Sequence, residues 1–176
     1  MTPARRSAAL ALALALVLCG PLAANACELV FSEHRSQREL LRLPLRATEP
    51  RADVAFTHSV LGTPVLDRYV WRAGTPGWRA HLVEEQFDGE GYGLPSAPGP
   101  GERLERVLAG GRSFSRLTLD RVVDPLVVRP LPAQQMRVQV AGQAPVLLGH
   151  LSDQAIELRA KGCQKQADPT EDNTQP

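Results

Sequence analysis

The stretch FTHSVLGTPVLDRYVW, residues 56–71, decides how the fold is interpreted. Apolar and polar side chains alternate on both sides of Gly62-Thr63-Pro64, as they do in two half-buried strands joined by a turn. Because Pro64 has no amide hydrogen, a two-residue turn at Gly-Thr would lack its closing donor. A four-residue connection, 61–64, avoids this problem. The resulting register pairs side chains on one face: His58 with Asp67, Phe56 with Tyr69 and Val54 with Trp71.

The same alternation recurs along the chain and predicts about ten short, mainly antiparallel strands. With 14 Gly and 15 Pro among 176 residues, long helices are disfavoured. The sequence therefore predicts a single all-β domain, a sandwich or a barrel, with at most one short helix. The expected strands are 28–32, 40–46, 53–59, 65–72, 79–87, 113–122, 126–129, 136–140, 146–148 and 156–160.

Residues 102–109, ERLERVLA, are the one helical candidate. The segment is followed by Gly110-Gly111, and glycine commonly terminates a helix.

The N-terminus has the features of a secretory signal peptide. Arg5 and Arg6 precede a short Ala/Leu/Val run, and Ala24-Asn25-Ala26 offers a cleavage site after residue 26. Removal of residues 1–26 leaves 150 residues with a net charge of −1, which gives no electrostatic reason to expect nucleic-acid binding. No later segment is long and apolar enough to span a membrane. The polar end, residues 164–176, is expected to be disordered.

Two cysteines remain after cleavage, Cys27 and Cys163, near the two ends of the predicted domain. In an oxidising compartment such as the periplasm an even pair indicates a disulfide. The alternative is a lipid anchor, because Cys27 directly follows the cleavage site. The preceding Ala24-Asn25-Ala26 lacks the leucine that a lipoprotein signal places three residues before its cysteine.

The candidate functional cluster consists of polar residues in the apolar phase of this hairpin and of the next strand. His58 and Asp67 form the predicted pair, Tyr69 shares the face of Asp67, and Glu85 on the following strand can approach Asp67. A carboxylate beside an imidazole suits a general base or a zinc ligand. The same pair can also serve only to fix the strand register. The spacing matches no known metal motif, so no metal or cofactor is assigned.

A second candidate is the loop segment Gly91, Tyr92, Gly93, Leu94 and Pro95. No helix start follows these glycines, so a phosphate-binding loop is not indicated. The glycines are expected to adopt positive φ at a sheet rim, and a ligand-binding rim is the alternative interpretation.

Taken together, His58-Ser59-Val60, Thr63-Pro64-Val65, Asp67, Tyr69 and the later Gly-Tyr-Gly-Leu-Pro resemble a bacterial family called domain of unknown function 1850. Asp67 stands where that family usually has Glu, and Tyr92 where it usually has Ala. The resemblance implies a small exported protein whose gene often lies beside tripartite ATP-independent periplasmic (TRAP) transporters.

Two functions are therefore expected. The first is a periplasmic accessory or binding protein that works with a TRAP permease or its solute-binding protein, as the resemblance implies. The alternative is a small metal-dependent or acid–base hydrolase that uses His58, Asp67 and Glu85.

Overall fold

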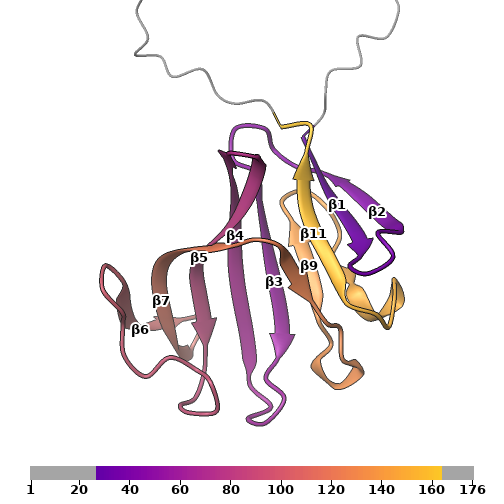
Figure 1. Ribbon diagram of the computed structural model, residues 1–176. Helices are drawn as coiled ribbons and strands as arrows, with labels where there is room; N and C mark the ends of the chain where they lie inside the picture. The colour runs from indigo at the N-terminus through magenta and orange to yellow at the C-terminus, as the bar shows by residue number, and fades with distance from the viewer. Residues whose placement is uncertain (1–26, 164–176) are drawn as a thin grey trace, which may run out of the picture.

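The computed structural model describes residues 27–163, which form two antiparallel sheets packed into a sandwich (Figure 1). The smaller sheet has the order β2 (Glu39–Pro44), β1 (Glu28–Glu33), β11 (Ile156–Lys161) and β8 (Leu126–Val128). The larger sheet has the order β10 (Val146–Leu147), β9 (Arg137–Val140), β3 (Arg51–Thr57), β4 (Pro64–Gly74), β5 (Gly77–Phe87), β7 (Arg112–Val123) and β6 (Arg103–Ala109). Two short 3₁₀ turns complete the described chain, η1 (Pro132–Gln134) and η2 (Leu148–His150).

The predicted all-β class is confirmed, and each of the ten predicted strands forms with ends within two residues of those expected. Within the described part of the chain, no helix is long and apolar enough to cross a membrane. The predicted signal peptide, 1–26, and the predicted polar tail, 164–176, lie outside the described residues.

The predicted helix at 102–109 is wrong, because this segment forms the edge strand β6. Ala109 pairs with Arg112, so Gly110-Gly111 is a two-residue hairpin loop between β6 and β7. Both glycines have positive φ, 57° and 75°, as a type I′ hairpin turn requires. The glycines that suggested a helix end instead reverse the chain in a hairpin.

The predicted register of β3 and β4 is also wrong. Phe56 faces Val65 and Val54 faces Asp67, so each partner is displaced by four residues from the expected one. The connection is longer than predicted: β3 ends at Thr57, opposite Pro64, and the loop spans residues 58–63. Because the displacement is an even number, the predicted faces remain correct although the pairs do not.

The interior contains two hydrophobic clusters that share the inner face of the larger sheet. The main core fills the space between the two sheets and includes Tyr69 and Trp71 of β4. A smaller core gathers Val65 of β4 with Phe87, Leu117 and Leu119. Asp67 lies between Val65 and Tyr69 on the same face of β4, so a carboxyl group stands where the two cores meet.

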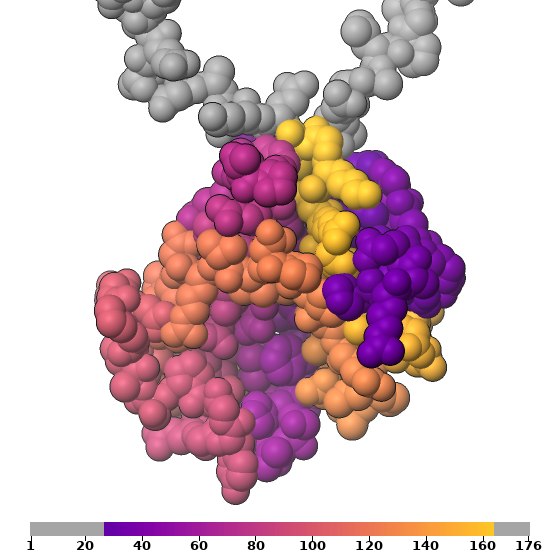
Figure 2. Space-filling model, in the orientation of Figure 1, coloured from indigo at the N-terminus to yellow at the C-terminus, as the bar shows by residue number. Residues whose placement is uncertain are grey.

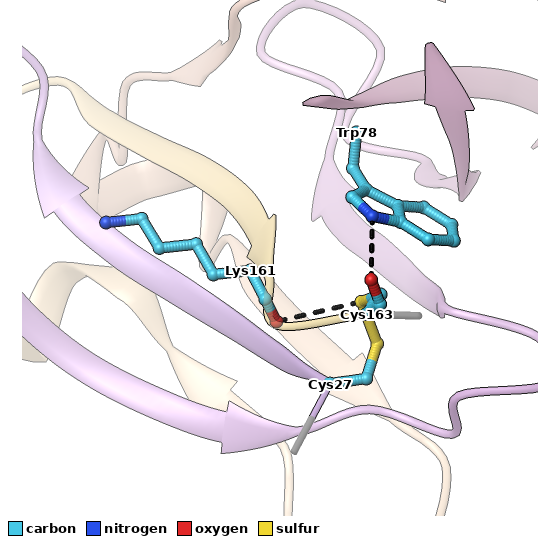
Figure 3. The surroundings of a disulfide bond; sticks show 4 residues. All are labelled: Cys27, Trp78, Lys161 and Cys163. Atoms are coloured by element: carbon cyan, nitrogen blue, oxygen red, sulfur yellow. Dashed lines mark hydrogen bonds between the residues drawn. A yellow bond between two sulfur atoms is a disulfide. The ribbon is translucent and has the colours of Figure 1, made fainter. Parts of the chain in front are cut away.

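The predicted disulfide between Cys27 and Cys163 is present and joins the residue before β1 to the second residue after β11 (Figure 3). The indole nitrogen of Trp78, on β5, donates a hydrogen bond to the Cys163 carbonyl at 3.0 Å. This contact attaches the end of the smaller sheet to the larger one. Cys27 itself is buried in the main core.

Candidate functional site

The clearest candidate site is an acid pair on the inner face of the larger sheet. Asp67 of β4 lies directly opposite Glu85 of β5, and Tyr69 follows on the same face of β4. Side chains opposed in this way have Cβ atoms about 4.5–5.5 Å apart. The sequence therefore identified three members of one cluster, although it left the pairing of Glu85 open.

Burial determines the protonation of this pair. The pKa of Asp67 rises to about 7, first because the carboxyl is buried and second because Glu85 faces it. Contact with the Tyr69 hydroxyl offsets part of the rise. The Oδ1 atom of Asp67 is buried and has no hydrogen-bond partner among residues 27–163. Near neutral pH the pair therefore holds an exchangeable proton.

The neighbouring groups are affected by the same environment. Burial raises the pKa of the Tyr69 hydroxyl above its usual range, and the charges of Asp67 and Glu85 add to this effect. Burial also raises the pKa of Glu85, while the guanidinium of Arg121 opposes that rise. Tyr69 therefore remains a neutral hydrogen-bond donor beside the acid pair.

An ion pair borders the acid pair, and sequence reasoning missed it. Arg121 of β7 donates to Glu102 Oε1 with its Nε at 2.6 Å, and Glu102 Oε2 accepts the Gly99 amide at 2.8 Å. The sequence contained one signal for Arg121. Arg121 continues the inward-facing positions of Leu117 and Leu119 along β7. A charged residue at an otherwise apolar position is the same signal that identified Asp67. Glu102 was not identified because residues 102–109 were predicted to form a helix.

His58 does not join the acid pair, which corrects the predicted cluster. The residue lies in the loop after β3, beyond the last paired residue of that strand. Within residues 27–163, no three His, Cys, Asp or Glu side chains are placed to hold a metal ion. The zinc site considered for His58, Asp67 and Glu85 is therefore not formed.

The imidazole of His58 instead holds two loops together. Its Nδ1 accepts the amides of Val60 and Leu61, both at 3.2 Å, so the neutral ring carries its hydrogen on Nε2. That Nε2–H donates to the carbonyl of Tyr92 at 3.3 Å, across a sequence separation of 34 residues. We call this arrangement the His58 staple. It connects the loop 58–63 to the loop 88–101.

The predicted loop rim, Gly91 to Pro95, is the segment that the His58 staple holds. Gly91, Tyr92 and Gly93 have positive φ, which confirms the conformation expected of the two glycines. Leu94 packs against the smaller core and so anchors the loop to the sheet. The Tyr92 side chain points outward and is 70% exposed.

Figure 2 shows the molecular surface hollowed below the band of chain that leads from β7 toward β8. The floor of the hollow has the colour of β3 and β4. The acid pair itself belongs to the inner face of β4 and β5.

Comparison with known proteins gives one match. Residues 53–147 match the family model described as "Domain of unknown function (DUF1850)". The matched range begins within β3 and runs to the end of β10, and therefore includes both the acid pair and the His58 staple. No curated protein and no solved structure matches the chain significantly.

The raised pKa of Asp67 predicts how stability depends on pH. A carboxyl whose folded-state pKa is raised from 3.8 to about 7 stabilises the fold below pH 3.8, and the stabilisation is lost as pH rises toward 7. At about 1.4 kcal/mol per pH unit, the loss is at most about 4 kcal/mol. Asp67→Asn should abolish most of this loss and stabilise the domain at pH 8, measured by urea unfolding with the disulfide intact. Asp153→Asn, at an exposed position, is the control; an unchanged pH slope in Asp67→Asn would contradict the assignment.

The His58 staple predicts a graded response to substitution. His58→Ala removes both sets of bonds and should cost about 1–2 kcal/mol. His58→Asn can still accept the Val60 and Leu61 amides but is too short to reach Tyr92. Hydrogen exchange at Val60 and Leu61 should therefore accelerate in His58→Ala only, whereas exchange in the loop 88–101 should accelerate in both variants. His150→Ala, at an exposed position, is the control, and equal exchange in all variants would rule out the staple.

Proposed function

The chain belongs to the domain of unknown function 1850 family, and we propose that it is an exported accessory protein that binds a solute or a protein partner of a TRAP-type uptake system. The observation that carries the binding role is the burial of Asp67 opposite Glu85. Two facing carboxyl groups at a junction of apolar cores reduce stability near neutral pH. Retention of both carboxyl groups despite this loss of stability favours a role for them in binding or proton exchange.

Export is supported by the pairing of Cys27 with Cys163. Disulfides persist in oxidising compartments such as the periplasm and are rare in the cytosol. The signal-peptide features of residues 1–26 favour the same location. A sulfur atom engaged in this disulfide cannot also carry a thioether-linked lipid, so the two interpretations of Cys27 exclude each other. We favour the disulfide form, with 27–163 as the folded domain and 164–176 as a polar tail.

The partner-binding role is supported by the loops that the His58 staple joins. Val60 is 61% exposed and Tyr92 is 70% exposed, and the backbone of each residue contacts the same imidazole ring. Two apolar side chains are thus presented together on loops that are braced from within. Loops held on a rigid sheet are common places for recognition. We propose that these loops contact the transporter.

Photo-crosslinking in cells tests this proposal. A photoreactive residue at position 60 or 92 should capture a TRAP permease or its solute-binding protein. The same residue at Leu108, which is also exposed but lies on β6, should not. The uncaptured chain should have the mass of residues 27–176 less two hydrogens and should appear in the periplasmic fraction. Capture of neither transporter component, or a lipid-modified chain in the membrane fraction, would contradict the proposal.

An acid–base hydrolase is the second candidate function, and the pKa of Asp67 near 7 favours it. A general acid or base works best when its pKa lies near the working pH. The reaction would depend on Asp67 and Glu85, because both ring nitrogens of His58 are occupied by backbone groups.

Turnover measurements separate the two candidates. If the domain is a hydrolase, it should cleave a member of a panel of chromogenic esters, phosphoesters and glycosides. Asp67→Asn should then lower the rate by about 100-fold or more, since general acid–base catalysis contributes about 10²–10⁴-fold. Loss of activity in Asp67→Asn but not in Asp153→Asn would show that the activity belongs to the site and not to a contaminating enzyme. Equal rates in wild type and Asp67→Asn would exclude the enzyme.

A further inference from the structure

The outer face of the larger sheet carries a groove that the acid pair does not use. It has a volume of about 330 Å³ and lies over the ends of β3, β4 and β5 and the hairpin of β6 and β7. Val65 and Phe87 point inward, so their neighbours Leu66 and Gln86 point to the outer side. We call this feature the outer groove. Its apolar lining includes Ala55, Pro64, Leu66 and Phe114.

Two arginines also line the outer groove, from opposite sides. Arg137 lies on β9, opposite Ala55 of β3, and Arg112 begins β7. In the strand order β9-β3-β4-β5-β7, three strands separate them. Both side chains are exposed, and within residues 27–163 neither has a carboxylate within 4.0 Å. Each guanidinium is therefore free to bind an anion from solvent.

The charged side chains in the row next to the outer groove are paired with one another. A row of alternating charges crosses five strands next to the outer groove: Asp53, Arg68, Glu84, Arg116 and Glu105. Arg68 contacts Asp53 at 2.9 Å and Glu84 at 3.0 Å. Arg116 lies 3.6 Å from Glu105 and also covers the Phe114 ring. Charges in the row thus compensate one another, whereas Arg112 and Arg137 are left uncompensated at the groove.

One acidic residue, Asp88, also lines the outer groove, and it lies 3.9 Å from Arg106. With its charge largely matched by Arg106, the groove retains an excess of positive charge. An apolar lining with guanidinium groups on two sides complements a ligand that has both an apolar part and a carboxylate. The volume is at the lower end of the range of about 300–1,000 Å³ for small-molecule sites, so a small ligand is indicated.

We propose that the outer groove binds a small organic anion in which a carboxylate is attached to an apolar body. The apolar body lies over Leu66 and Phe114, and Arg112 or Arg137 forms a charge-assisted hydrogen bond with the carboxylate. This site lies on the opposite face of the sheet from Asp67 and does not rest on the proposed transport role. Binding at the groove can therefore be tested separately from partner capture or turnover.

Titration with octanoate, followed by amide chemical shifts of the intact disulfide-bonded domain, tests this proposal. Octanoate should shift the signals of Ala55, Leu66, Gln86 and Phe114, and 1-octanol and octylammonium should bind at least about tenfold more weakly. At least one of Arg112→Ala and Arg137→Ala should weaken octanoate binding by about 5- to 10-fold, and unchanged affinity in both variants would overturn the role of the guanidinium groups.

The matched control is Arg46→Ala, because Arg46 is also exposed but lies in the turn after β2, away from the groove. It should leave octanoate affinity unchanged. Equal affinity for octanoate and octanol would overturn the anion specificity. Shifts confined to the inner face around Asp67, equal weakening by Arg46→Ala, or no saturable shifts at all would overturn the site itself.

Discussion

The pairing of β4 with a strand on each side is the constraint on which the other features depend. Val54, Asp67 and Glu85 form one row across β3, β4 and β5, and this register fixes the face of each neighbouring side chain. A register shift between Arg68 and Tyr69 places an extra β5 residue at Val83, yet keeps Leu82 and Glu85 on the inner face. The inner face therefore carries the acid pair, and the outer face carries the charge row and the outer groove. A slip of one residue would exchange these two sets.

Alternation in the sequence was sufficient to predict the fold class and every strand except β6. Alternation indicates which face of a strand is buried, because the burial of each residue depends on its own side-chain type. Pairing depends on loop geometry, which alternation does not contain. The loop 58–63 is two residues longer than predicted, and the His58 ring accepts its Val60 and Leu61 amides in addition to the backbone bonds within the loop. The same limitation explains β6, since Gly110-Gly111 can end a helix or reverse a hairpin.

Strand periodicity was sufficient to predict the part of the candidate site that lies on strands. Asp67, Tyr69 and Glu85 were found because each stands in an inward phase of its strand. His58 was grouped with them because it continues the inward phase of Val54 and Phe56, although its real partners are backbone groups of two loops. His58 and Tyr92 are separated by 34 residues in the sequence, and no local pattern indicates such a contact. Asp67 and His58 thus belong to the same hairpin but take part in different contacts.

The covalent link between Cys27 and Cys163 also has a mechanical meaning. It joins the first residue of the described domain to the last, and both lie at the same end of the sandwich (Figure 1). If the chain is pulled from its two ends, the load passes through the sulfur–sulfur bond and bypasses the strands between them. While the disulfide is intact, tension along the polypeptide therefore cannot unzip the sheets. The acid pair and the stapled loops are isolated from any force applied to the ends of the chain.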